Sequence, residues 1–191
     1  RTTLAGEGLQ HQDGHSLHTA LSVPTCRAYD PAYAYELAVI IQDGIKRMYQ
    51  DQESVFYYLT VMNEQYEHPE MPKGARDGIL KGMYKLKAAP EASAESKKDG
   101  KGRLRAQLFG SGAILNEVVK AQGLLQKYGV AADVWSVTSY TQLYRDGHAC
   151  DRWNMLHPGE TPKVPYVTQC LKDAPGVLVA ASDYCKVLPD S

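Results

Sequence analysis

The order of apolar segments constrains this fold more than any other feature, because a strand, a helix and a second strand follow one another early in the chain. Residues 24–29 have the composition of a short buried strand, residues 31–49 carry apolar residues at helical spacing, and residues 54–61 are rich in aromatic and β-branched residues. A helix that joins two strands is the connection that parallel pairing requires. The first part of the chain therefore predicts a parallel α/β unit.

The helix over residues 31–49 has both a start signal and an apolar face. Asp30-Pro31 predicts its beginning, because an acidic N-cap followed by proline at the first helical position is a strong start. Residues 1–24, with closely spaced glycines, are predicted to form an irregular loop. The residues that recur at helical spacing, and so predict the buried face, are Ala34, Leu37, Ala38, Ile41, Ile45 and Met48.

A second α/β unit is predicted after two interruptions of regular structure. Residues 68–72 contain two prolines, which exclude a continuous strand or helix and mark a domain boundary. Residues 88–101 form a polar, low-complexity loop, after which the second unit is expected to begin. Its predicted strands cover residues 103–109, 132–137 and 177–181, and its predicted helices cover residues 113–128, 140–146 and 165–172.

Composition excludes several classes of protein. The 191 residues carry 21 basic and 22 acidic side chains, and this balance argues against a dedicated nucleic-acid binder. No apolar run approaches the 18 residues of a membrane span. The cysteines form no Cys-x-x-Cys pair, which is typical of reduced thiols in a cytoplasmic protein. They are Cys26, Cys150, Cys170 and Cys185.

A glycine turn suggests a nucleotide site, but only weakly. Gly110-Ser111-Gly112 lies between a predicted strand and a predicted helix, where helix-terminal N–H groups could meet a phosphate. The dinucleotide fingerprint needs a third glycine at position 115, which is Leu115. Asp133 stands near the place of a ribose-binding acid. An ordinary short turn before a helix explains the same residues.

Histidines near the N-terminus give a second candidate site. His11, His15 and His18 lie within eight residues, but Gly14 interrupts the helix that a pair of zinc ligands four residues apart would need. A functional loop and an inert polar loop both remain open, because glycines allow close approach to a ligand and histidine transfers protons near neutral pH. His148 and Cys150 are predicted to lie in a loop, without forming a nucleophilic pair.

Several longer strings occur in the order of a known family. They include Arg-Thr-Thr-Leu-x-Gly-Glu-Gly-Leu-Gln-His-x-Asp-Gly-His-Ser at residues 1–16, Tyr-Asp-Pro-Ala-Tyr-Ala-Tyr-Glu at residues 29–36 and Arg-Trp-Asn-Met-Leu-His-Pro at residues 152–158. Together they resemble the homodimeric bacterial type of pyruvate dehydrogenase, the decarboxylating component of the pyruvate dehydrogenase complex. The resemblance covers nearly the whole chain except residues 88–101, which look like an insertion.

The resemblance implies a transketolase-like α/β fold. Residues 1–71 would be the C-terminal end of the middle, pyrimidine-binding domain, and residues 72–191 would be most of a truncated three-layer C-terminal domain. The parent enzyme would use thiamine diphosphate and Mg²⁺ to decarboxylate pyruvate and pass the acetyl group to lipoyl groups. Its partners would be a second copy and the dihydrolipoamide acetyltransferase of the complex. The cofactor motif would lie outside this chain, so the chain alone is expected to be inactive.

The resemblance also points to site residues. His11 would be the catalytic residue that reaches the pyruvate-derived group, with Glu7 and His15 as supporting residues of the same loop. Gln12 and Leu17 stand where the family has an acid and a second histidine, and His18 follows one place later. Two alternatives remain: another 2-oxo acid dehydrogenase or transketolase, or a non-catalytic interaction and dimerisation module.

Overall fold

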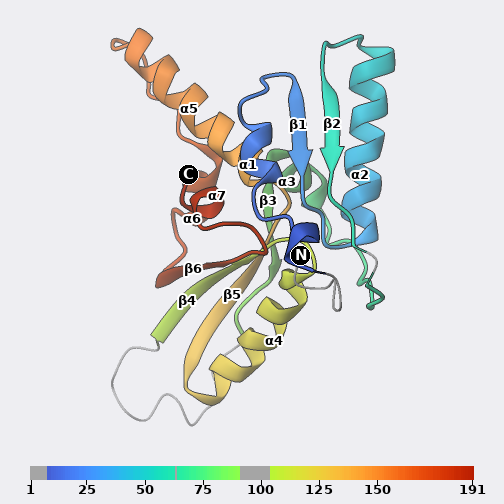
Figure 1. The fold of residues 1–191 in the computed structure, drawn as a ribbon. Coiled ribbons are helices and arrows are strands. Elements are labelled where there is room, and N and C mark those ends of the chain that lie inside the picture. Colours follow the sequence, from blue (N-terminus) through green and yellow to red (C-terminus); the bar gives the residue numbers. More distant parts are fainter. Residues whose placement is uncertain (1–7, 63, 91–103) are drawn as a thin grey trace.

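The computed structural model describes residues 8–62, 64–90 and 104–191, and it has an α/β architecture with two sheets (Figure 1). Helices alternate with strands along most of the chain. The elements in chain order are η1 (Leu9–His11), α1 (Ser16–Ala20), β1 (Cys26–Tyr29), α2 (Ala34–Ile45), η2 (Lys46–Gln50), β2 (Phe56–Leu59), α3 (Ala75–Lys81), β3 (Met83–Lys87), β4 (Leu104–Gly110), α4 (Ile114–Lys127), β5 (Val130–Val137), α5 (Tyr140–Leu156), α6 (Tyr166–Leu171), β6 (Val177–Ala181) and α7 (Val187–Asp190).

The first sheet confirms the predicted strand–helix–strand unit. β1 and β2 pair in parallel, from Cys26 opposite Phe56 to Tyr29 opposite Leu59. Helix α2 connects them and lies beside β2 in Figure 1. The second strand covers four residues of the predicted segment 54–61.

The second sheet has four strands in the order β3-β5-β4-β6. Strands β5, β4 and β6 are parallel, while β3 is antiparallel to β5. Helix α4 connects β4 to β5 on one side, and α5 and α6 lead the chain across to β6 on the other side of β4. All three predicted strands of this unit are confirmed, and Gly129 ends the turn after α4 with a φ of 76°.

The prediction that the second unit begins after residues 88–101 is wrong. Helix α3 and strand β3 precede that loop, and β3 forms the edge of the four-stranded sheet. Neither was predicted; both elements are short, seven and five residues. The loop prediction itself falls mostly on residues 91–103, which lie outside the described residues.

The predicted start of α2 is also wrong. The helix begins at Ala34 with Tyr33 as its N-cap, and Asp30 precedes it in a buried, non-helical segment. The reason is tertiary: the Asp30 N–H donates to the Thr138 carbonyl at 2.8 Å, and the Asp30 carbonyl accepts the Gly112 N–H at 3.1 Å. Bonds to two loops of the second sheet outweigh the local start signal.

The predicted buried face of α2 is mostly exposed. Ile41 and Ile45 are 44% and 55% exposed, and Ala34 and Ala38 are exposed as well. The buried residues of the helix are Glu36, Val39, Ile40 and Gly44. The buried positions are each shifted by one residue from the predicted ones, and they include the carboxylate of Glu36. For α4, by contrast, the predicted apolar residues Leu115 and Val118 are buried.

Two further differences concern helices. Residues 140–146 were predicted as a short helix, but α5 continues to Leu156 and contains both His148 and Cys150, so the predicted loop there is wrong. The predicted irregular loop over residues 1–24 contains α1, whose Leu17 and Ala20 are buried. The structure describes only residues 8–24 of that loop.

The buried residues form three clusters, and each of them joins residues of the first unit to residues of the second. Residues of α1 and β1 pack with the side of the second sheet that carries Met83, Trp135 and Val137. On its other side, α4 and Tyr33 pack against Ala106, Leu108, Ala132 and Val134. None of the described helices is long and apolar enough to cross a membrane.

Candidate functional site

His11 lies on a short loop that leads into α1. His11 ends the 3-10 turn η1, and its N–H donates to the Gly8 carbonyl at 3.0 Å. Its side chain is exposed. An exposed imidazole on a loop that glycines keep open can reach a ligand and exchange a proton or a hydrogen bond with it.

Asp13 fastens this loop to the start of α1. Its Oδ1 atom accepts the N–H groups of His15 at 3.1 Å and Ser16 at 2.9 Å, and its Oδ2 atom accepts the Ser16 hydroxyl. The loop also docks on the residues after β6, because the Cys185 N–H donates to the Gly14 carbonyl at 2.8 Å. The Tyr184 hydroxyl donates to Asp13 Oδ2 at 3.5 Å.

These contacts place the loop at the carboxyl edge of the four-stranded sheet. β6 ends at Ala181 and β4 ends at Gly110, and the two residues are paired. The next residues, Ser111 and Ser182, join through their hydroxyls at 3.3 Å. Figure 1 shows the N-terminal end of the described chain beside the region where these strands converge. Open α/β sheets bind ligands at this edge, so the position supports a functional loop over an inert one.

The other predicted site residues have different positions. Glu7 lies outside the described residues. His15 precedes the first turn of α1 and is exposed, and His18 lies on α1 itself. His11 and His15 therefore do not share a helix, and residues 8–62, 64–90 and 104–191 contain no group of three or more His, Cys, Asp or Glu arranged to hold a metal ion.

The glycine turn is used for packing instead of for a nucleotide. The Gly112 N–H, which could have met a phosphate, is bonded to the Asp30 carbonyl. A Cβ atom at Gly110 would come within 2.8 Å of the Leu115 Cα atom, so glycine is needed for the approach of α4. The turn after β4 is thus held by the Asp30 segment and by α4.

Asp133 does not serve a ribose either. It lies within β5 with its carboxylate 3.4 Å from Lys85 Nζ and 3.5 Å from an Arg105 nitrogen. Burial opposes its ionisation, but the Ala89 N–H at 2.6 Å and the neighbouring Lys85 keep the pKa of Asp133 below its ordinary value. The acid belongs to a small ion-pair cluster of the sheet.

His148 and Cys150 face different surroundings on α5. The His148 ring is exposed and lies 4.2 Å from the Tyr144 ring, between centroids. The Cys150 side chain is buried, and burial raises the pKa of its thiol. All four cysteines are free, as predicted, although only Cys26 and Cys150 are buried.

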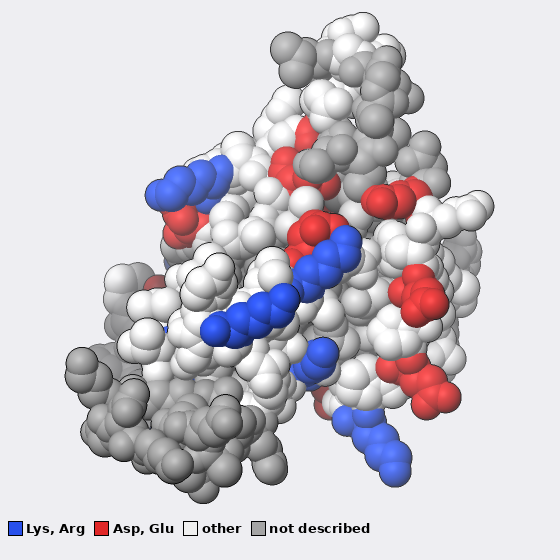
Figure 2. Space-filling view, turned by 90° about the horizontal axis from the view of Figure 1, so that it is seen from below, with Lys and Arg blue, Asp and Glu red and all other residues white. Residues whose placement is uncertain are grey.

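Charge is mixed on the surface seen in Figure 2. Acidic and basic side chains both occur on this face: basic side chains form a short diagonal row across its middle, beside an acidic side chain, and further acidic side chains lie toward the right. The balance of 21 basic and 22 acidic residues is therefore matched by a mixed distribution on this side.

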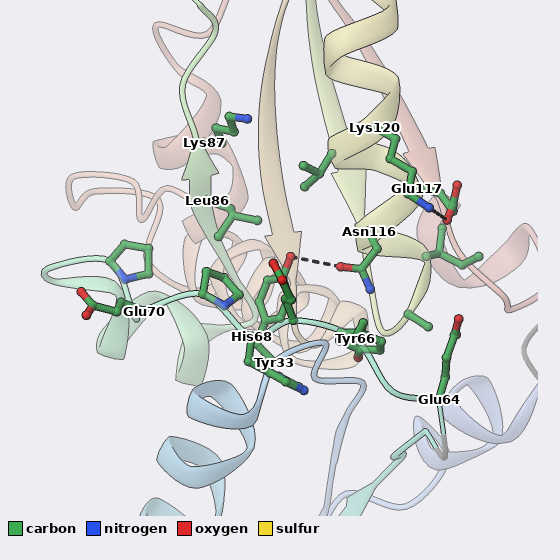
Figure 3. A pocket seen from close by; sticks show the side chains of 16 residues that line it. Tyr33, Glu64, Tyr66, His68, Glu70, Leu86, Lys87, Asn116, Glu117 and Lys120 are labelled. Atoms are coloured by element: carbon green, nitrogen blue, oxygen red, sulfur yellow. Dashed lines mark hydrogen bonds and ion pairs between the residues drawn. The ribbon is translucent and has the colours of Figure 1, made fainter.

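A pocket of about 960 Å³ was not foreseen from the sequence (Figure 3). It lies between the residues that follow β2, the end of β3 and the first turns of α4, and none of the predicted site residues lines it. Tyr66 and His68 stack at 5.0 Å between centroids, and the Tyr33 hydroxyl donates to Asn116 at 3.3 Å. Burial raises the pKa of Tyr33 to about 12. Tyr33 and Asn116 are 83 positions from each other in the sequence, and Tyr66 and His68 lie on a third segment, so only tertiary structure brings these residues together.

Comparison with known proteins gives the family. Residues 82–191, more than half of the chain, match the family described as the transketolase-like TK C-terminal domain. The chain belongs to this family. Residues 1–69 match the family described as the pyruvate dehydrogenase E1 component middle domain. These matches confirm the transketolase-like α/β fold predicted above.

Individual relatives agree with the family. The chain is 55% identical over 192 residues to the pyruvate dehydrogenase E1 component of Escherichia coli, and 54% identical over 188 residues to that of Pseudomonas aeruginosa. These alignments cover 100% and 98% of this chain but only 20% of each relative. The predicted resemblance to bacterial pyruvate dehydrogenase is confirmed, and the chain spans about a fifth of the length of these relatives.

A solved structure agrees on the fold. A transketolase variant from Pichia stipitis has a TM-score of 0.56 and 16% sequence identity, and the match covers 92% of this chain and 21% of that chain. At this identity the likeness concerns the fold alone.

Proposed function

We propose that these residues are part of a thiamine-diphosphate-dependent pyruvate dehydrogenase, an oxidoreductase that decarboxylates pyruvate and passes the acetyl group to lipoyl groups. The observation that carries this proposal is 55% identity over the whole chain to a pyruvate dehydrogenase E1 component. An identity this high along both sheets and the loop between them favours the same chemistry. The proposal applies to the whole protein, of which this chain would be an inactive part.

The proposed organisation follows from the same relatives. Residues 1–71 would end the middle domain, and residues 72–191 would form most of the C-terminal domain. The whole protein would be a homodimer that passes acetyl groups to the dihydrolipoamide acetyltransferase of its complex. The free cysteines support a cytoplasmic location.

His11 is the residue that we propose to act on the substrate. Its imidazole is exposed, and its loop is bonded through the Gly14 carbonyl to the Cys185 N–H, after the end of β6. A hydrogen bond from this ring to a substrate oxygen would stabilise the charge that develops there during decarboxylation, and it would do so most strongly once water is excluded. Glu7 and His15 would support this loop.

The cofactors do not fit the residues described here. Mg²⁺ prefers carboxylate and carbonyl oxygens in near-octahedral geometry, and the described ranges contain no cluster of metal-binding side chains. Mg²⁺, and with it the diphosphate of thiamine diphosphate, would therefore be held by other parts of the whole protein. The contribution proposed for this chain is the positioned imidazole of His11.

The test is the His11→Ala variant of the whole enzyme. Turnover of pyruvate should fall by about 10²-fold, the effect typical of losing a positioned acid–base or hydrogen-bonding group. His148→Ala is the matched control, because this histidine is also exposed but lies on α5. Steady-state acetyl transfer measures the effect, with circular dichroism to verify folding. Normal turnover in a folded His11→Ala enzyme would contradict the role proposed for His11. A wild-type enzyme that prefers another 2-oxo acid would contradict pyruvate as the substrate.

A further inference from the structure

We propose that Asp13 is a positioning residue that sets the place of His11 by tying its loop to both α1 and the residues after β6. This inference rests on the function proposed for His11. Asp13 lies two residues after His11, and its carboxylate contacts both the start of α1, two and three residues further on, and Tyr184, which is 171 positions away.

The loop needs such a tie because its own sequence does little to fix it. Gly8 and Gly14 flank the segment that carries His11, and glycine loses more conformational freedom on folding than any other residue. The turn η1 covers only three residues, and the His11 side chain is exposed. Without contacts to the rest of the molecule, the imidazole would sample many positions.

The contact to α1 gives the loop a fixed base. Helix α1 is anchored by Leu17, which is 2% exposed, and by Ala20 in the cluster beside the second sheet. Asp13 Oδ1 accepts the N–H groups of His15 and Ser16, which lie at the start of that helix, where backbone donors lack a partner within the helix. A carboxylate is well suited here, since the first turn of a helix favours negative charge.

The contact to the residues after β6 gives the loop its direction. Tyr184 is 6% exposed and packs in the same cluster as Leu17, so its hydroxyl is a fixed donor toward Asp13 Oδ2. Beside it, the Cys185 N–H holds the Gly14 carbonyl at 2.8 Å. With both oxygens engaged, the Asp13 carboxylate cannot shift without breaking contacts on two sides.

The effect of Asp13 on turnover would therefore pass through His11. A displacement of about 1 Å in a catalytic group can lower a rate 10²-fold, although no contact to the substrate is lost. Loss of the Asp13 carboxylate would free the two backbone donors of α1 and the Tyr184 hydroxyl together. The loop would then hold His11 less often in the productive position.

The experiment is a double-mutant cycle in the whole enzyme with its cofactors bound. Asp13→Ala should lower kcat by about 10- to 100-fold while the KM for pyruvate changes less than about threefold, because His11 is proposed to act in the chemical step. In the His11→Ala background, Asp13→Ala should cause less than about a twofold further loss, since residues that act as a unit are not additive.

Conservative variants separate positioning from general stability. Asp13→Asn keeps one acceptor oxygen for the two N–H groups but loses the second acceptor, toward Tyr184, so it should lower kcat less than Asp13→Ala, by about two- to fivefold. Tyr184→Phe removes only the hydroxyl and should lower kcat by about two- to fivefold. Asp173→Ala changes an exposed acid elsewhere and should leave kcat unchanged.

The outcomes distinguish this inference from the proposed function. Normal kcat in Asp13→Ala, with His11→Ala impaired, would overturn the role of Asp13 and leave that of His11 intact. An equal loss from Asp13→Ala with and without His11 would show an effect that does not pass through His11, which also overturns it. Normal kcat in His11→Ala would instead remove the proposed function of that residue.

Discussion

Substitution of Glu36 would measure how much its hydrogen bonds between α2 and the second sheet contribute to the free energy of unfolding. Glu36 is 0% exposed, and its carboxylate accepts four hydrogen bonds. Oε2 accepts the N–H groups of Ala32 at 2.6 Å and Tyr33 at 3.1 Å, which closes the start of α2. Oε1 accepts the hydroxyls of Tyr84 at 2.7 Å and Ser136 at 2.6 Å, on β3 and β5. One side chain thus links α2 to the second sheet.

The size of the effect follows from what each substitution leaves behind. Glu36→Ala strands the buried N–H groups of Ala32 and Tyr33, at about 1–3 kcal/mol each, while the two hydroxyls can turn toward other acceptors. We expect the free energy of unfolding to fall by about 3–5 kcal/mol. Glu36→Gln keeps one acceptor oxygen for the two N–H groups and should lower it by about 1–2 kcal/mol. Both are large against a total of about 5–15 kcal/mol.

The pH dependence gives a second check. Burial raises the pKa of Glu36 above its ordinary 4.5, although its hydrogen bonds oppose this shift. A raised pKa means that the folded chain binds this proton more tightly than the unfolded chain. The Glu36 contribution to stability therefore grows as the pH falls from neutral through the folded-state pKa toward 4.5. Glu36→Gln lacks this proton, so its deficit relative to the wild type should widen between pH 7 and pH 5.

The assay is urea unfolding of the 191-residue chain, followed by circular dichroism at both pH values, with wild type and variants compared at the same chain concentration and in the same state of association by light scattering. Glu160→Ala, a change of an exposed acid, should stay within about 0.5 kcal/mol of the wild type. Equal stability of Glu36→Ala and the wild type would refute the reasoning from stranded donors. A deficit of Glu36→Gln that narrows at pH 5 would refute the raised pKa.

Two further predictions concern packing and association. Gly110→Ala should lower the free energy of unfolding by about 1–3 kcal/mol, because the added Cβ atom would meet the α4 backbone at Leu115. Urea unfolding measures this change, and an unchanged midpoint would contradict the prediction. The isolated chain should be a dimer or a heterogeneous aggregate in light scattering after size-exclusion chromatography, because it exposes large apolar side chains. These include Ile41, Ile45 and the β6 residues Val177 and Leu178. A stable 21.1 kDa species would contradict this prediction.

Sequence order was enough to predict most of the second sheet and the first parallel pair. Strand and helix periods are local properties, and each predicted strand of 103–109, 132–137 and 177–181 lies in the sheet. The strings at residues 1–16 and 152–158 were enough to indicate the family, because long strings in order rarely recur by chance. The same strings singled out His11, whose role remains a prediction.

Tertiary structure alone decided the features that depend on distant partners. Local signals start α2 at Asp30, but its backbone bonds to the Thr138 and Gly112 loops keep Asp30 out of the helix. Apolar spacing selects Ile41 and Ile45 as the inward face, whereas Glu36 is buried because donors from β3 and β5 surround it. The tie from Asp13 to Tyr184 spans 171 positions of sequence. A single sequence carries no local signal for such contacts, because the two partners are far apart in the chain and interact only once the fold brings them together.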